Sequence, residues 1–297
     1  MRRIDSTELN VVGEQYDSIA EFYRVNENRN LNPNYSSDYS CGKDSKRKVK
    51  PDVEYTWEQT QHDMMLGSDL FNAEFDRMLS EIKSKIPNAW RVGNRNRTKK
   101  DFVGQSVSVG RALSGHPKSF NRQRPVRLKQ KMVSIFFSIS CPHYTSTEDR
   151  MRAGCIIMAI CEHLEECGYQ TRIMYSPDFS FGKYGGKWDD PKNPSQILQM
   201  SLKGFDTRFN LRKMQFPLAS ESALFHVGCW WNHRFPGTQF DWGYGEGYAV
   251  DNDDRRLESA RKFAKSQDAV YVSIPFIKNE CDMDIMKVYD YIMGEIS

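Results

Sequence analysis

The feature that most constrains the fold is a strand–helix–strand pattern between residues 132 and 175. Residues 132–139 (MVSIFFSI) form a nearly continuous apolar run, which is typical of a strand buried on both faces of a sheet. Residues 148–167 repeat apolar positions at helical steps, and Gly168 follows as a favourable helix C-cap. A second strand is expected at 169–175. We therefore expect a β-α-β unit with two parallel strands and a right-handed crossover.

The alternation of strands and helices continues toward the C-terminus. The expected segments are, in order, a short helix near 195–203, apolar segments at 209–216 and 223–227, a helix at 254–266, a strand at 269–275 and a last helix at 282–296. Strands that alternate with helices are typical of an α/β architecture. We predict a three-layer α/β domain over residues 132–297, in a chain that is α+β overall.

The N-terminal part of the chain has a different composition. Residues 1–60 are polar and rich in Asn, Ser, Tyr and charge, which indicates a loop-rich, extended arm. Apolar residues then recur at helical spacing over 61–86, and Pro87 ends the expected helix because proline cannot continue the backbone hydrogen bonds. We expect this helix and the basic segment that follows it to form a second region, residues 61–131.

Composition excludes several classes of protein. Hydrophobic residues make up 39% of the 297 residues and aromatic residues 12%, which is too much for a wholly disordered chain. No stretch approaches ~18 uninterrupted apolar residues, so we expect no membrane-spanning helix. Without an apolar signal sequence at the N-terminus, we expect a cytoplasmic protein whose seven cysteines are reduced thiols.

Basic residues are concentrated in residues 91–131. This segment holds twelve Lys and Arg against one acid, Asp101, although the whole chain carries a formal charge of only +3. A contact with phosphates or with an acidic protein face is one interpretation, and a solvated surface is the other. The candidate contact residues are Arg95, Arg97, Lys99, Lys100, Arg122 and Arg124.

A second unusual segment, residues 225–248 (FHVGCWWNHRFPGTQFDWGYGEGY), combines aromatic residues with five glycines. Aromatic side chains supply much of the energy of protein interfaces, but they also fill cores. We expect a loop that is partly core and partly contact surface. Its candidate contact residues are Trp230, Trp231, Phe235, Trp242 and Tyr244.

The sequence contains only weak signals for catalytic, nucleotide-binding or metal-binding residues. No glycine-rich phosphate loop or Walker lysine follows the strand at 132–139, which argues against nucleotide hydrolysis. Cys141 and His143 precede the helix and Cys167 ends it, about 30 Å away, so a single zinc ion cannot join them. No residue is predicted to be catalytic, and no metal or other cofactor is expected. An enzyme acting on a small substrate remains an alternative, with His143 or Asp178 as its participants.

One stretch carries a family resemblance. Residues 104–118 (GQSVSVGRALSGHPK) resemble a Gly-x-x-Val-x-Val-Gly-Arg-x-Leu-x-Gly-x-Pro pattern in a family of bacteriophage proteins. The residue before the proline is commonly acidic in that family, whereas His116 stands here. The similarity continues through the helix that ends in EHLEECGY, residues 162–169, and covers roughly residues 90–175.

The length and arrangement of the chain further resemble phage anti-defence proteins that inhibit the bacterial Gabija complex. That resemblance implies a stoichiometric inhibitor rather than an enzyme. It would act in the host cytoplasm, as an oligomer that wraps the Gabija nuclease and its helicase-like partner and blocks DNA binding or cleavage. The alternative function is nucleic-acid binding through residues 91–131.

Overall fold

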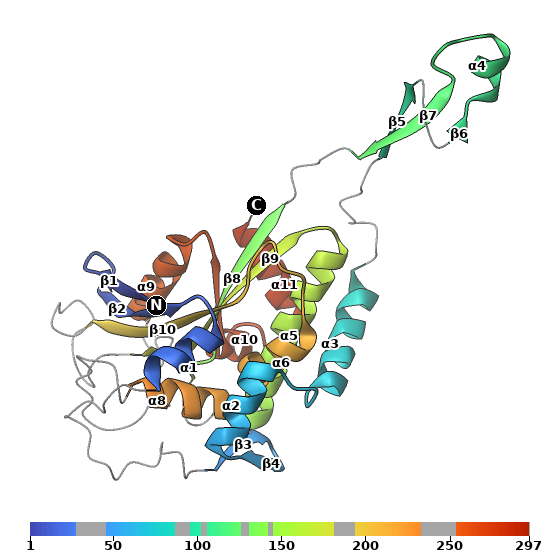
Figure 1. Ribbon diagram of the computed structural model, residues 1–297. Coiled ribbons are helices and arrows are strands. Elements are labelled where there is room, and N and C mark those ends of the chain that lie inside the picture. Colours follow the sequence, from blue (N-terminus) through green and yellow to red (C-terminus); the bar gives the residue numbers. More distant parts are fainter. Residues whose placement is uncertain are drawn as a thin grey trace.

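A six-stranded sheet organises the body of the protein, and helices pack on both of its faces (Figure 1). The computed structural model describes residues 1–27, 46–86, 96–101, 106–125, 131–141, 145–180, 194–232 and 254–296. In spatial order the strands are β1 (Arg2–Ser6), β2 (Val11–Tyr16), β10 (Ser195–Lys203), β9 (Gln170–Ser180), β8 (Met132–Ser138) and β11 (Val270–Ser273). Three neighbouring pairs are parallel and two are antiparallel, so the sheet is mixed.

The remaining elements surround this sheet or form small units of their own. The helices of the body are α1 (Ile19–Asn26), α2 (Trp57–Leu66), α3 (Asn72–Lys85), α5 (Thr147–Glu166), α6 (Leu211–Ala219), α7 (Glu221–Ala223), the π-helical η2 (Leu224–Cys229), α8 (Trp230–Asn232), α9 (Asp254–Lys265), α10 (Ile274–Asn279) and α11 (Ile285–Glu295). Strands β3 (Arg47–Lys50) and β4 (Val53–Tyr55) pair as a separate antiparallel ribbon. A third unit contains β5 (Asn96–Asp101), β6 (Ser106–Val107), α4 (Val109–Leu113) and β7 (Phe120–Pro125).

The predicted β-α-β unit is present as β8, α5 and β9. The two strands are parallel neighbours, with Phe137 opposite Tyr175. The side chain of Ser146 caps the start of α5 by accepting a hydrogen bond from the amide of Asp149, which satisfies a donor that the helix itself cannot. At the other end Gly168 has a φ of +89°, and the amide of Tyr169 returns to the carbonyl of Leu164. This is a Schellman ending, which the glycine permits because it has no Cβ.

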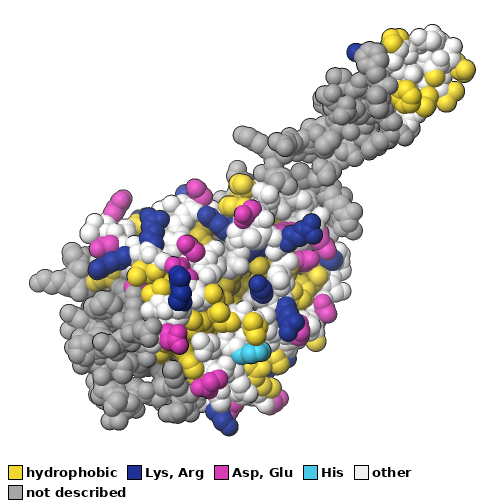
Figure 2. All heavy atoms as spheres, viewed as in Figure 1, with side chains coloured by type: hydrophobic (Ala, Val, Ile, Leu, Met, Phe, Trp, Pro, Cys, Tyr) yellow, Lys and Arg dark blue, Asp and Glu magenta, His cyan; other side chains and the backbone are white. Residues whose placement is uncertain are grey.

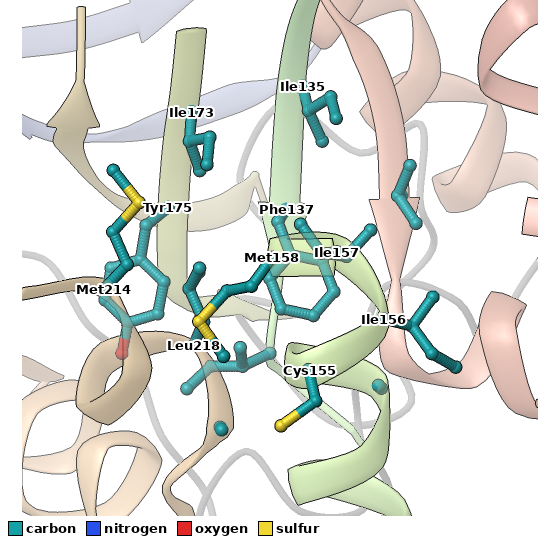
Figure 3. Packing of buried hydrophobic residues seen from close by; sticks show 14 of the residues in the cluster. Ile135, Phe137, Cys155, Ile156, Ile157, Met158, Ile173, Tyr175, Met214 and Leu218 are labelled. Carbon is teal, nitrogen blue, oxygen red and sulfur yellow. The ribbon is translucent and has the colours of Figure 1, made fainter. Parts of the chain in front are cut away.

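Helix α5 lies between the sheet and an outer layer of helices. Its side chains meet residues of β8, β9 and α6, among them Phe137, Tyr175 and Leu218, all of which are buried (Figure 3). Gly154 allows α6 to approach closely, because a Cβ at this position would collide with the backbone of Leu218. The opposite face of the sheet is covered by α9, whose Phe263 packs edge-to-face on Phe136 of β8.

Residues 2–6 and 11–16 are part of the sheet, which corrects the arm expected over residues 1–60; residues 28–45 of that arm lie outside the described residues. Strand β2 lies parallel to β10, and its residues Val11 and Tyr16 are fully buried. Local composition did not reveal this strand because its partner lies about 180 residues further along the chain. The α/β body therefore takes strands from both ends of the chain and extends beyond residues 132–297.

The single helix expected over 61–86 is two helices, α2 and α3. Gly67 ends α2 with a φ of +89°, and the amide of Ser68 donates to the carbonyl of Arg212 at 2.8 Å. That contact with α6 diverts the chain, so the apolar pattern continues on a new helix axis. Helix α3 ends at Lys85, shortly before Pro87, as predicted.

Two other expectations were wrong or incomplete. Residues 195–203, expected as a helix, form β10, which is held between β2 and β9 by hydrogen bonds on both sides. The apolar segments at 209–216 and 223–227, for which no element type was predicted, lie largely in α6 and in the helical run α7–η2. The predicted helices near 254–266 and 282–296 are present as α9 and α11, and the strand at 269–275 is the shorter β11.

None of the helices in the described ranges is long and apolar enough to cross a bilayer. The apolar residues of the longest described helix, α5, are buried in the protein core.

The same substitution at two helical glycines tests the packing of α5. Gly154→Ala should lower the free energy of unfolding by about 1–3 kcal/mol, because the new methyl group meets the backbone of α6. Gly294→Ala in α11 should raise it by up to about 1 kcal/mol, because nothing lies within 4 Å of its added Cβ. Urea unfolding of both variants measures the difference. Equal effects at the two positions would contradict the close contact of α5 with α6.

Candidate functional site

The small unit β5–β6–α4–β7 forms a lobe, residues 96–125, that projects away from the body (Figure 1). Its three strands are arranged in the order β5-β7-β6 and do not join the six-stranded sheet. The lobe lies inside the basic segment that the sequence singles out. It contains most of the described residues of that segment.

Short-range hydrogen bonds shape the tip of the lobe, residues 106–119. The amide of Ser108 donates to the carbonyl of Ser119 at 2.7 Å, which joins the two sides of the tip. Helix α4 starts after Ser108 and ends near Gly115, whose φ of +70° turns the chain back. The amide of His116 then donates to the carbonyl of Arg111 at 2.9 Å. Strand β6 stops at Val107, and Val109 begins α4.

The tip exposes apolar side chains. Val107, Val109 and Leu113 are 48%, 66% and 84% exposed, and Figure 2 shows hydrophobic atoms gathered at the far end of the lobe. An added Cβ on Gly110 or Gly115 would find nothing within 4 Å, so the surrounding space is open. Clustered exposed hydrophobic side chains are typical of a contact surface.

The strands behind the tip carry paired positive residues. In the antiparallel register of β5 and β7, Arg97 is opposite Arg124 and Lys99 is opposite Arg122. Positions two residues apart share a face of a strand, so these four positions share one face of the ribbon. Lys100 is opposite Asn121 and belongs to the other face. The register thus concentrates four of the six predicted basic candidates; Arg95 lies outside the described residues.

The predicted aromatic candidates do not form a surface in the described residues. Trp230 and Trp231 are buried, and the ring of Trp230 lies 4.8 Å from that of Trp57, centroid to centroid. Neither indole is available to a partner in this arrangement, because α7, η2 and α8 turn the segment into the core. Phe235, Trp242 and Tyr244 lie outside the described residues.

A buried polar network around Glu14 has no signal in the sequence. The hydroxyl of Tyr16 donates to Glu14 at 2.6 Å, and the indole nitrogen of Trp231 donates to the same carboxylate at 2.9 Å. Asn26 in turn donates to the hydroxyl of Tyr16 at 2.9 Å. These hydrogen bonds compensate for the burial of the carboxylate. They also connect β2, α1 and α8, so we assign the network a structural role.

Most of the described cysteine and histidine side chains are buried in the core. Within the described part of the chain, no three His, Cys, Asp or Glu residues come together in a way that could hold a metal ion. Burial raises the pKa of the Cys141, Cys155 and Cys161 thiols, which keeps them protonated and poorly nucleophilic at neutral pH. Burial likewise lowers the pKa of His163.

The carboxyl end of β8 presents small polar residues rather than a reactive group. Ser138 and Ser140 are buried, and their hydroxyls have no hydrogen-bond partner among the described residues. Of the two residues considered for an enzyme, His143 lies outside the described residues, and Asp178 is described only as a backbone position in β9. This edge of the sheet supplies no assembled catalytic geometry on the described part of the chain.

A groove of about 610 Å³ lies beside β11 on the body. Two of its four cations have partners in or beside the groove: Lys262 forms an ion pair with Glu258 at 2.8 Å, and Arg172 donates to the carbonyl of Gln267. Arg172 also lies over the ring of Phe205. The groove therefore mixes four cations with three acids, Glu258, Asp268 and Glu295, unlike the lobe.

The described geometry defines a mixed α/β protein with a projecting basic lobe. Residues 3–286 match the model of a family described as a domain of unknown function, DUF7192. The match spans nearly the whole chain, so the protein belongs to this family. No curated protein and no solved structure matches the chain.

Substitution of Trp231 separates a core role from a contact role. Trp231→Ala should lower the free energy of unfolding by about 3–5 kcal/mol, because it removes a fully buried ring and a donor to Glu14. Leu66→Ala, at a position 60% exposed, is the matched control and should change stability by less than about 0.5 kcal/mol. Thermal or urea unfolding measures both. A Trp231→Ala protein of unchanged stability would contradict the core assignment.

Proposed function

We propose that this protein is a phage-encoded inhibitor that binds a bacterial anti-phage defence complex, the Gabija nuclease with its helicase-like partner. It acts in the host cytoplasm by stoichiometric binding. Several copies wrap the complex and block its binding or cleavage of DNA. The proposal joins the sequence resemblance to the position of the residues that carry it.

The observation that supports this proposal most is the location of the resembling motif. Of residues 104–118, the described part, 106–118, forms the tip of the lobe. A motif that served only to stabilise the fold would be expected in the core. Here its Val107, Val109 and Leu113 are exposed, which is the arrangement expected of residues that enter a partner's surface.

The charge distribution supports binding among several copies. Residues 91–131 carry twelve of the 42 basic residues and one of the 39 acids, so the rest of the chain has an excess of acids. The basic lobe of one copy can therefore attract the more acidic body of another. This attraction favours an assembly with repeated contacts around a large partner.

A substitution at the tip tests the proposed contact. Leu113→Asp should weaken binding to the purified Gabija complex by at least about 30-fold, because it places a carboxylate where an apolar side chain would enter the partner. Stability should stay unchanged, since Leu113 is 84% exposed. Co-elution on size exclusion and a titration by light scattering measure the binding.

Leu66→Asp is the control, because Leu66 is also exposed but lies on α2 of the body. It should leave binding unchanged. If the wild-type protein does not co-elute with the complex at micromolar concentrations, the proposed partner is wrong. If Leu113→Asp and Leu66→Asp bind equally well, the tip is not the contact.

A further inference from the structure

The two edge strands of the six-stranded sheet differ in how well they are covered. At one edge, all four residues of β11 are buried, and the hydroxyl of Tyr291 in α11 donates to the carbonyl of Tyr271 at 3.3 Å. At the other edge, Arg2, Arg3 and Asp5 of β1 are exposed, and β1 pairs with β2 alone among the described residues. The unpaired backbone amides and carbonyls of an exposed edge can accept another strand.

The side chains of β1 alternate between the two faces of the sheet. Ile4 is buried in the cluster that contains Phe263 of α9. Arg3 and Asp5 flank Ile4, so both project from the opposite face. Neither side chain forms an ion pair within the described part of the chain. An open edge strand therefore carries one free positive and one free negative charge on the same face.

The spacing of these charges is self-complementary in one register. When two identical strands pair in antiparallel fashion about a two-fold axis, the axis passes through a residue, because hydrogen-bonded and non-hydrogen-bonded pairs alternate along the ladder. An axis at Ile4 places Arg3 of each copy opposite Asp5 of the other. An axis at Arg3 or at Asp5 places like charges opposite each other. Opposite charges stabilise a cross-strand pair, and like charges destabilise it.

The surroundings of β1 also permit pairing. A groove of about 550 Å³ is lined by all five residues of β1, and its other walls include Met174 of β9 and Phe263 of α9. A groove lined by five consecutive residues follows the strand along its length. A proline or a β-bulge often protects an edge strand from pairing. Strand β1 has neither, because its sequence is RRIDS and its register with β2 is continuous.

We propose that β1 pairs with β1 of a second copy of this chain, in an antiparallel two-fold register centred on Ile4. The sheets of the two copies form one continuous sheet, with an Arg3–Asp5 pair on each side of the axis. Two five-residue strands bury little surface, so the dimer is weak and its register depends on the two ion pairs. The inference adds a specific contact to the proposed assembly of several copies, but it concerns the free protein and needs no host complex.

The test is sedimentation velocity of the untagged full chain at concentrations from about 1 to 100 μM. The wild-type protein should shift from monomer to dimer over this range. R3D and D5R should each weaken the dimer at least about tenfold, because each replaces two attractive pairs by two repulsive ones. The double variant R3D/D5R exchanges the two charges and should restore the wild-type dimer within about threefold.

An equimolar mixture of R3D and D5R tests the register itself. R3D leaves only carboxylates at the two positions and D5R leaves only guanidinium groups, so each protein alone should be monomeric where the wild type is dimeric. The mixture should dimerise about as tightly as the wild type, because both cross-strand pairs are then complementary. A mixture that stays monomeric overturns the register.

K85E and E81K are the matched controls, because they make the same changes of net charge at an ion pair on α3, away from β1 (Figure 1). Each should keep the wild-type dimer within about threefold. Equal losses in the control and β1 variants would assign the effect to net charge and overturn the site. Thermal unfolding confirms that every variant is folded.

Two further outcomes overturn the proposal outright. One is a wild-type chain that stays monomeric at about 100 μM. The other is a pair of variants, R3D and D5R, that both dimerise like the wild type, which places the interface elsewhere. L113D should leave the dimer unchanged, so failure of the tip contact with the host complex and failure of β1 pairing give different results.

Discussion

The body of the protein depends on the burial of helix α5. Twelve of its 20 residues are buried, and it packs against the sheet on one side and against α3, α6 and α10 on others. A helix in this position must present apolar residues to its neighbours, and ten of the twelve buried residues of α5 are apolar; the exceptions are Arg150 and His163. The charge of Arg150 is compensated by Glu221 at 2.7 Å, which also fixes the start of α7. Displacement of α5 would expose the hydrophobic core that this helix shares with the sheet and with α3, α6 and α10.

Local sequence patterns predicted the elements that α5 organises. Strand β8, helix α5 and Gly168 follow from a buried apolar run, a helical repeat and a left-handed cap, each of which is visible within about twenty residues. The N-terminal strand β2 and the strand β10 were missed because their stability comes from pairing with each other across the whole chain. Residues 195–203 alone do not distinguish a strand from a helix; the neighbouring strands decide it.

The candidate site was predicted in part. Counting charges located the basic segment, since composition needs no knowledge of the fold. The opposition of Arg97 to Arg124 depends on the register of two strands separated by the tip, and no local pattern specifies that register. For the aromatic candidates Trp230 and Trp231, composition was misleading. Trp230 and Trp231 have the composition of a contact surface, but Glu14 and Trp57 hold them in the core.

The fold also explains the near-neutral charge of the chain. The body needs its acids to compensate individual cations, as in the pairs of Lys203 with Glu165 and Lys278 with Asp149. No described residue of the lobe belongs to the hydrophobic clusters of the body, and the apolar residues Val107, Val109 and Leu113 at its tip are exposed. We therefore propose that stability and binding of the host complex belong to different parts of one chain.

The most direct test of this division replaces residues 96–125 with a short Gly-Ser linker and measures urea unfolding of the shortened protein. We predict that the free energy of unfolding stays within about 1 kcal/mol of the wild-type value, because the six-stranded sheet and its helices are retained. A loss of several kcal/mol, or failure to fold, would show that the lobe is part of the core. It would contradict the assignment of the lobe to binding alone.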